Sequence, residues 1–231
     1  MGQKTTPENL QVIYEDNHLI VVNKRPGDIV QGDKTGDMPL SEIVKQYIKV
    51  KYHKPGNVFL GVVHRIDRPT SGLVIFARTS KALTRMNQML KEHQIQKTYH
   101  AIVKKAPPEK AGTLVHYLKK NTRTNKSTAY EKPVAGAKRA VLHYKQIASS
   151  DKYHLLEINL ETGRPHQIRV QLAKIGSPIK GDLKYGFPRS NKNGGISLHA
   201  RKLDFIHPVK KEALQLTAAY PEDDIWQHLQ V

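Results

Sequence analysis

The sequence predicts an α+β protein built on a largely antiparallel sheet, and two features of the chain lead to this prediction. Segments with strand character outnumber segments with helical periodicity, and few strand–helix units alternate strictly along the chain. The chain has 231 residues, of which 38% are hydrophobic. A chain of this size can bury a substantial core as one domain.

The first elements are two short strands, at Leu10–Tyr14 and His18–Asn23, which a polar turn joins. A helix is expected over Leu40–Tyr47. Gly72–Arg78 is an apolar, β-rich run of the kind that forms a buried strand. These segments predict a sheet that begins near residue 10, preceded by a tail of residues 1–9.

A second helix is expected at about Lys81–His93, because its apolar residues share one face and Ser80 suits the N-cap position. Tyr99–Val103 is the next expected strand. Residues 104–139 then hold ten lysines and arginines against two glutamates, together with prolines and asparagines. They predict a basic hairpin or a pair of long loops. A solvated excursion and a flap that grips RNA are both possible, and the charge favours the flap.

The remaining chain returns to core character. Val141–Ile147 and His154–Leu160 are expected strands, and Pro165–Ile175 is an expected amphipathic helix with Pro165 in its first turn. Strands at 196–203 and 213–218 and a closing helix at 221–229 complete the prediction. One domain over residues 10–231 is therefore expected.

The charge of the chain points to a polyanionic partner. There are 38 Lys+Arg against 20 Asp+Glu, which gives a net charge of +18. Nucleic acid is favoured over an anionic membrane or a simple solubility effect. The absence of cysteine excludes disulfides, thiolate metal sites and a cysteine nucleophile. No apolar h-region or membrane-length run occurs, so a cytoplasmic protein without a membrane partner is expected.

Asp67 is the first candidate for chemistry. It lies in the polar segment HRIDRPTSG, directly before the apolar run. Loops at the ends of core strands often present reactive groups. Arg65 and Arg68 flank the carboxylate and favour its charged form, in which it can act as a nucleophile or base. On spacing alone, a turn aspartate that caps backbone N–H groups is the simpler explanation.

A second polar cluster, ETGRPHQIR at 161–169, lies at a predicted strand-to-helix junction. Its arginines, Arg164 and Arg169, and the pair His166-Gln167 are expected near a helix N-terminus, which favours phosphate. An ordinary helix cap with charged surface residues is the alternative.

Together these clusters resemble the motifs of the RluA-type pseudouridine synthases. HRIDRPTSGL resembles that family's catalytic-aspartate motif, H-R-[LI]-D-x-x-T-S-G, and ETGRPHQIRVQL resembles its third motif. Lys97-Thr98-Tyr99 is similar to its K-x-Y strand, and VIYEDNHLIVVNK is similar to its first strands. Leu198-His199-Ala200 followed by His207-Pro208 resembles its C-terminal signature. The matches keep the family's order from about Leu10 to Pro208.

The resemblance implies a pseudouridine synthase fold, with a mixed sheet and a central cleft that holds the uridine. It implies that Asp67 is the catalytic carboxylate, that Arg164 pairs with it, and that Tyr99 stacks on the uracil and is a candidate to take the C5 proton. Arg65 would enter the RNA stack in place of the extruded base, and Ile168 would line the base pocket. The other RNA-contacting candidates in these motifs are His64, Thr70, Ser71 and Arg169.

The implied reaction converts specific uridines of structured rRNA or tRNA to pseudouridine. Extruding the base costs a few kcal/mol, which a planar cation and an aromatic face can partly offset. The carboxylate would attack C1′ or remove the C2′ proton, and the sequence leaves both routes open. No cofactor and no metal are implied, no obligate protein partner is expected, and RNA should be bound by a monomer.

The chain departs from the family in two places. The family's first motif often reads K-P-x-G, whereas this chain has Lys24-Arg25-Pro26-Gly27. Because the proline is displaced, no catalytic role is predicted for this segment. The catalytic domain is expected to begin by Leu10, which leaves no room for the S4-type domain of many relatives. RNA contacts are therefore expected from the basic flap and the cleft walls.

Two other functions stay open. A metal-dependent nuclease is conceivable, although its candidate ligands lack the spacing of known metal sites; they are His64, Asp67, His166, His199 and His207. A non-catalytic RNA-binding module on the same fold is the other alternative. The presence of Asp67, Tyr99 and Arg164 argues against that module.

Overall fold

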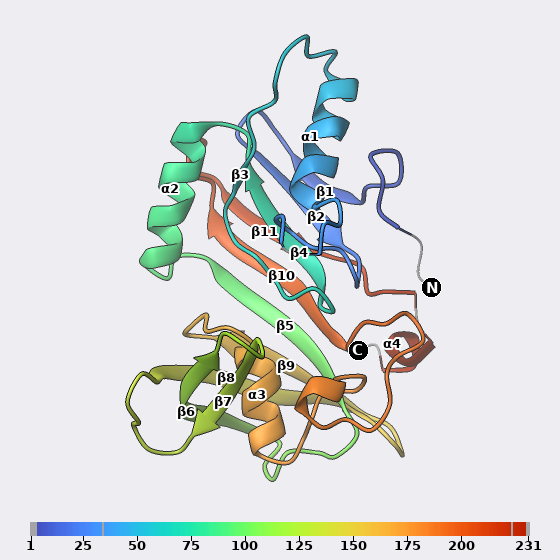
Figure 1. Cartoon of the computed structure of the whole chain (residues 1–231), viewed down its shortest axis with the longest axis vertical. Helices are drawn as coiled ribbons and strands as arrows, with labels where there is room; N and C mark the ends of the chain where they lie inside the picture. Colours follow the sequence, from blue (N-terminus) through green and yellow to red (C-terminus); the bar gives the residue numbers. More distant parts are fainter. Residues whose placement is uncertain (1–3, 34, 223, 230–231) are drawn as a thin grey trace. The chain divides into compact units, whose positions relative to one another are not determined.

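The computed structural model describes residues 4–33, 35–222 and 224–229. Two compact units make up the chain (Figure 1). The first unit comprises Met1–Lys97 and Ala200–Pro221, and the second comprises Thr98–His199 and Glu222–Val231. The chain passes between the units within two strands, β5 (Gln96–Val103) and β10 (Leu198–Ile206), and once more after Pro221.

The first unit has the strand order β1-β2-β4-β10, with β3 beside β4 and β11 beside β10. The pairs β1–β2, β2–β4, β3–β4 and β10–β11 are antiparallel. The other elements of this unit are β1 (Val12–Glu15), β2 (Leu19–Lys24), β3 (Gly61–Val62), β4 (Ser71–Ala77), β11 (Ala213–Thr217), α1 (Leu40–Lys51) and α2 (Ser80–Lys91).

Every residue of β4 is buried, as the apolar run predicts. Side chains alternate between the two faces of a strand, and both faces of β4 are covered. On one face Phe76 packs in a cluster with Val44 of α1. On the other face Ile75 packs in a cluster with Met86 of α2. The segment that precedes β4, which contains Asp67, is therefore attached to a rigid strand.

The helices of the first unit differ from the prediction at their ends. Helix α1 continues to Lys51, beyond the expected end at Tyr47. Thr79, and not Ser80, is the N-cap of α2, because Thr79 has extended backbone and its Oγ1 accepts a hydrogen bond from Ala82 N at 3.2 Å. Ser80 is the first residue of the helix itself.

Asp16 organises the turn between β1 and β2. Its Oδ1 accepts hydrogen bonds from the backbone N–H groups of His18 and Leu19, each at 2.8 Å. Its Oδ2 lies 3.1 Å from Nε2 of the buried His207. Nδ1 of His207 accepts from Lys210 N at 2.8 Å, so the ring proton belongs on Nε2, which faces Asp16. Burial raises the pKa of Asp16, but the hydrogen bonds outweigh burial and lower the pKa to about 2.

We expect Asp16 to stabilise the fold in a pH-dependent way. Its folded pKa lies below the ordinary value of 3.8, so its contribution is complete above about pH 4 and is lost as the pH falls through about 2. Asp16→Asn should lower the free energy of unfolding by about 2 kcal/mol near neutral pH. Urea denaturation from about pH 6 to about pH 2 measures this difference. A difference that stayed constant over that range would contradict the expectation.

Gly72 is required where β4 approaches β10. Its φ is +112°, and a Cβ at this position would lie 2.3 Å from the carbonyl oxygen of Ala200. The neighbouring atom is backbone and cannot turn away. A side chain here therefore meets both an unfavourable dihedral and a steric overlap.

Gly72→Ala should consequently lower the free energy of unfolding by at least about 2 kcal/mol. Gly56→Ala is the matched control, because a Cβ at Gly56 meets no heavy atom within 4 Å. The control should change stability by less than about 1 kcal/mol. Thermal or urea denaturation of both variants provides the comparison, and equal effects would refute this role for Gly72.

The second unit has the strand order β5-β9-β8-β6-β7, and each neighbouring pair is antiparallel. Strands β6 and β7 form a hairpin within the basic segment 104–139. The elements are β6 (Ala111–Asn121), β7 (Lys126–Tyr130), β8 (Lys138–Ser149), β9 (His154–Leu160), α3 (Gln167–Lys174), the short 3-10 helix η1 (Leu183–Tyr185) and α4 (Asp224–His228).

Helix α3 covers one face of this sheet (Figure 1). Val170 packs in a cluster with Leu118 of β6, Ala129 of β7 and Ala140 of β8. Gln171, which is fully buried, donates from Nε2 to Leu114 O at 3.1 Å. The helix is therefore held to the sheet by both apolar packing and a buried polar contact.

Two predicted helices begin later than expected. Helix α3 begins at Gln167 instead of Pro165, because His166 has a φ of 56° in the left-handed region. Pro165 lies outside the helix, and its carbonyl accepts a hydrogen bond from Ser127 Oγ at 2.8 Å. Helix α4 begins at Asp224 instead of residue 221. Residues 1–3 of the expected tail and residue 223 of the expected helix lie outside the described residues.

Candidate active-site residues

The candidates of the first unit lie on one continuous segment that leads into β4. Asp67 is partly buried and Arg65 is exposed, whereas Thr70 and Ser71 are each 2% exposed. Thr70 N donates to Asp67 O at 3.0 Å, which closes a turn that contains Pro69. The carboxylate of Asp67 is thus carried by a hydrogen-bonded turn at the entrance to a buried strand.

Lys24, at the end of β2, is buried beside this turn and is 1% exposed. Its ammonium donates to three backbone carbonyls, those of Arg25 at 2.9 Å, Asp28 at 2.8 Å and Arg68 at 3.0 Å. Burial lowers the pKa of Lys24 to about 7, and the charges of Asp28 and Asp67 act in the opposite direction. Lys24 therefore connects the residue that follows Asp67 to the segment that follows β2.

Further contacts join the same two segments. Gly27 N also donates to Arg68 O, at 2.9 Å. The Arg68 guanidinium forms an ion pair with Asp37 at 2.7 Å, and Arg65 Nη1 lies 3.4 Å from Gln31 Oε1 as a weak hydrogen bond. Gly27, Gln31 and Asp37 thus support the Asp67 turn. The displaced proline had predicted no catalytic role for the segment from Lys24 to Gly27, and its contacts with the Asp67 turn give it a positioning role.

His64 is held as a neutral acceptor. Its Nε2 accepts a hydrogen bond from Ile75 N of β4 at 3.2 Å. Burial, with a smaller contribution from Lys97, lowers the pKa of His64 to about 3. An imidazole in this state has no positive charge for a phosphate. Its hydrogen bond instead attaches the start of the HRID segment to β4.

We expect Lys24→Met to loosen the Asp67 turn, because three backbone carbonyls lose their donor. The free energy of unfolding should fall by about 3 kcal/mol or more. Amide hydrogen exchange should become faster at Gly27 and Thr70, whose N–H groups donate to Arg68 O and Asp67 O. Lys91→Met, at an exposed lysine of α2, should leave both quantities nearly unchanged. Unchanged exchange in Lys24→Met would show that the turn does not depend on this ammonium.

The candidates of the second unit lie on β5 and at the start of α3. Tyr99 is on β5, where it is 8% exposed and stands opposite Ile158 of β9. Ile168, in the first turn of α3, is 5% exposed. Arg164 lies in the loop between β9 and α3, and its Nε donates to Arg139 O at 3.0 Å. This bond uses one of the five N–H donors of the guanidinium.

Gln167 shapes the loop that carries Arg164. It is 3% exposed, and its Oε1 accepts hydrogen bonds from Arg164 N at 2.9 Å and Thr162 Oγ1 at 2.8 Å. Its Nε2 donates to Val141 O of β8 at 3.0 Å. These contacts attach the loop between β9 and α3 to strand β8. The sequence marked Gln167 only as a polar group near a helix N-terminus, and the structure gives it the central position in the loop.

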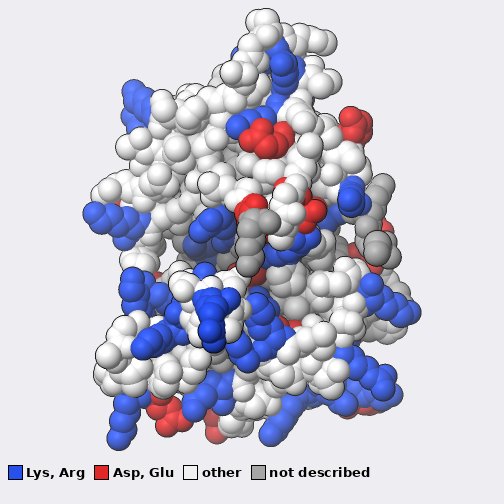
Figure 2. Space-filling model, in the orientation of Figure 1, with Lys and Arg blue, Asp and Glu red and all other residues white. Residues whose placement is uncertain are grey.

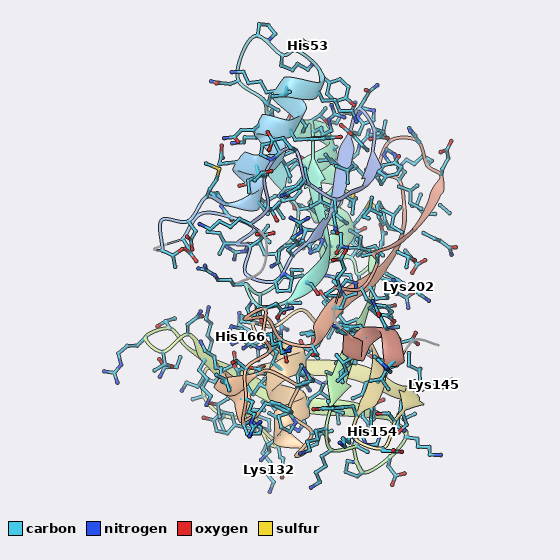
Figure 3. The ribbon with its side chains drawn as sticks, turned by 90° about the vertical axis from the view of Figure 1, so that its right-hand side faces the viewer. His53, Lys132, Lys145, His154, His166 and Lys202 are labelled. Carbon is cyan, nitrogen blue, oxygen red and sulfur yellow. The ribbon has the colours of Figure 1, made fainter. Side chains whose placement is uncertain are left out.

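Tyr185 connects the basic hairpin to the same junction. Its hydroxyl accepts a hydrogen bond from Ser127 N of β7 at 2.9 Å and lies 2.8 Å from Nδ1 of His166. The Ser127 side chain bonds to Pro165, as described above. Figure 3 shows His166 beside the end of α3 at which the helix begins. The hairpin is thus fixed to the ETGRPHQIR segment through hydrogen bonds at one residue of β7.

Arg169 lies in the interior of the second unit. It is 5% exposed and Asp182 is 1% exposed. Arg169 Nε and Nη2 reach the two carboxylate oxygens of Asp182 at 2.7 and 2.8 Å, and the guanidinium lies 5.1 Å from the ring centre of Tyr185. A bidentate buried pair fixes both partners in orientation. This place differs from the RNA-facing one that the motif had suggested.

The histidines considered as metal ligands have other contacts. His64 accepts from Ile75, His207 faces Asp16, and His166 bonds to Tyr185. His199 is fully buried, with its ring tilted against Trp226 at 5.9 Å. Across residues 4–33, 35–222 and 224–229, no group of three or more His, Cys, Asp or Glu side chains is placed to hold a metal ion. Within the same part of the chain, no helix is both long and apolar enough to cross a membrane.

Known proteins share this sequence and fold. Residues 18–174 match the family described as RNA pseudouridylate synthase. The chain is 33% identical over 243 residues to tRNA pseudouridine synthase C of Vibrio parahaemolyticus, covering 96% of this chain and 94% of the relative. It is 34% identical over 224 residues to ribosomal large subunit pseudouridine synthase D of Zymomonas mobilis, covering 93% and 70%.

A solved structure has the same fold. The human RNA pseudouridylate synthase domain containing 4 aligns with a TM-score of 0.77 at 23% identity, over 92% of this chain and 89% of that one. The α+β fold with a mixed sheet is therefore confirmed. The matches define the class as an RNA-modifying isomerase. The chain belongs to the RNA pseudouridylate synthase family, as its RluA-type motifs predicted.

Proposed function

We propose that this protein converts specific uridines in tRNA or rRNA to pseudouridine, with Asp67 as the catalytic carboxylate. One observation carries the choice of Asp67: its turn is held by a buried ammonium and leads into a buried strand. Catalysis requires a reacting group to be fixed in place. Relatives named as tRNA and large ribosomal subunit pseudouridine synthases support the two RNA classes.

In the proposed reaction, the bond from uracil N1 to ribose C1′ breaks and a bond from C5 to C1′ forms. The C5 proton leaves, and N1 gains a proton, so the product is an isomer of the substrate. Asp67 acts at the ribose, by attack at C1′ or by removal of the C2′ proton. Tyr99 stacks on the uracil and receives the C5 proton, Arg164 pairs with Asp67 and orients it, and Ile168 lines the base pocket.

The target base is proposed to leave the RNA helix before it reacts, because its reacting atoms are inaccessible in the stack. Arg65 is the candidate to fill the vacated space. It is exposed, and its planar guanidinium can both stack on bases and contact phosphate. The same segment is attached to the protein interior on both sides of Asp67. His64 bonds to β4 before it, and Thr70 and Ser71 are buried after it.

The net charge of +18 supports RNA as the partner. Figure 2 shows lysine and arginine side chains gathered on the visible face over the region of β6–β8 and α3. We propose that the protein acts as a monomer in the cytoplasm, and the absence of cysteine is compatible with that reducing compartment.

The test is to incubate the protein with tRNA and rRNA from cells that lack its gene, and to map pseudouridine by chemical modification and primer extension. Asp67→Asn should reduce pseudouridine formation by roughly a thousandfold or more while RNA binding is retained. Asp151→Asn, at an exposed turn carboxylate, should behave as wild type. Substantial isomerase activity in Asp67→Asn would refute the proposed role. Loss of activity in EDTA would favour the metal-dependent alternative.

A further inference from the structure

The sheet of the second unit has a second face, opposite α3, which we call the outer face. It is formed by the side chains of Val115, Tyr117, Lys119, Tyr130 and Arg139. Their neighbours along the strands point to the α3 side, where Leu118, Ala129 and Ala140 form the buried cluster. Alternation along each strand therefore separates the two sets.

Three residues of the outer face stand in one row across three strands. Tyr117 of β6 is directly opposite Tyr130 of β7 on one side. It is directly opposite Arg139 of β8 on the other side. Directly opposed side chains in an antiparallel sheet lie on the same face, with Cβ atoms about 5 Å apart. The side chains of two tyrosines and an arginine are thus on the same face of three adjacent strands.

The outer face is open to solvent and has unused binding capacity. Arg139 and Lys119 are exposed, Val115 is 42% exposed, and both tyrosines are partly exposed. Across the described residues, the tyrosine rings have no aromatic or cation–π partner and their hydroxyls no hydrogen bond. Exposed apolar surface rimmed by charge is typical of an interaction site.

The outer face is also linked to the candidate catalytic loop of the same unit. The backbone carbonyl of Arg139 accepts the hydrogen bond from Arg164 Nε at 3.0 Å. Arg139, the first residue of the row, is therefore in direct contact with the ETGRPHQIR segment through its backbone. Tyr99 lies on the α3 side of the same sheet, because it pairs with Ile158, which pairs with Tyr144 of β8. Nucleotides on the outer face would therefore lie outside the pocket of the target uridine.

We propose that the outer face binds unpaired nucleotides of the RNA substrate outside the pocket of the target uridine, with bases stacked on Tyr117 and Tyr130 and phosphates at Arg139 and Lys119. This inference rests on the proposed function. Aromatic rings provide a stacking surface that accepts any base, and neighbouring cations follow the backbone. The cations favour RNA over a second copy of this chain, whose net charge of +18 would repel it.

Binding of a short unstructured RNA that carries 2-aminopurine at a central base tests the proposal, because stacking on a ring quenches its fluorescence. Tyr117→Leu and Tyr130→Leu should each weaken binding by at least about fivefold and reduce the quenching. Tyr117→Phe keeps the ring and should bind within about twofold of wild type. Equal binding by the Leu and Phe variants would overturn the stacking role.

The cations are tested separately through the salt dependence of binding. Arg139→Gln should reduce the slope of log affinity against log salt by about 0.7, the value for one phosphate contact on a single strand. Because Arg139 is exposed, this variant is expected to fold even where a tyrosine variant does not. Lys152→Gln removes an equal charge from an exposed turn and should leave the slope unchanged. Equal slopes for both variants would overturn the phosphate contact.

The same RNA distinguishes this inference from the proposed function. Asp67→Asn should quench 2-aminopurine as wild type does, although it forms no pseudouridine. If wild type forms no pseudouridine in any RNA while Tyr117→Leu still weakens binding, the proposed function fails and the outer face stands as an RNA-binding surface. If pseudouridine forms but neither tyrosine nor Arg139 affects binding, the outer-face proposal fails alone. Association of the chain with itself through Tyr117 would also overturn it.

Discussion

The buried ammonium of Lys24 is the constraint on which the first unit's candidate site depends. A buried charge is tolerated only when hydrogen bonds replace the lost water, and three backbone carbonyls from two segments provide them. Neither segment can shift without leaving a charge or a carbonyl unsatisfied. Arg68, whose carbonyl is one of the three, directly follows Asp67. The hydrogen bond from Lys24 therefore fixes the backbone beside the proposed catalytic residue.

The second unit fixes its candidate loop by a different means. A buried pair, Arg169 with Asp182, holds the first turn of α3 against η1, and Gln167 arranges the loop that carries Arg164. Replacing one partner of such a pair leaves an uncompensated buried charge, so neither side chain can leave its position without a large loss of stability. In both units, buried polar groups therefore hold a loop that carries a solvent-accessible arginine. These arginines are Arg65, which is exposed, and Arg164, which is partly exposed.

The fold class and the buried strand β4 could be predicted because they depend on the local pattern of apolar residues. A strand that is covered on both faces, such as β4, gives a continuous apolar run that is easy to identify. The start of α3 could not, since the left-handed backbone of His166 is uncommon for a residue other than glycine. The role of Lys24 was hidden for another reason. Lysine is almost never fully buried, and one of its acceptors, Arg68 O, is 44 residues away in the chain. Motifs located the candidate residues, but contacts distant in sequence decide how they are held.

The lysines and arginines that give the chain its positive charge have two different roles, and the composition alone does not distinguish them. Lys24 and Arg169 are 1% and 5% exposed, and their cations hold loops through carbonyls and a carboxylate. Such side chains release few counterions to a binding RNA, because they are buried and bonded to groups inside the protein, where no phosphate reaches them. Contact with phosphate must come from exposed cations such as Arg65 and Arg139. The salt dependence of RNA binding should consequently report the exposed set, while stability reports the buried set, so each kind of substitution has its own measurable consequence.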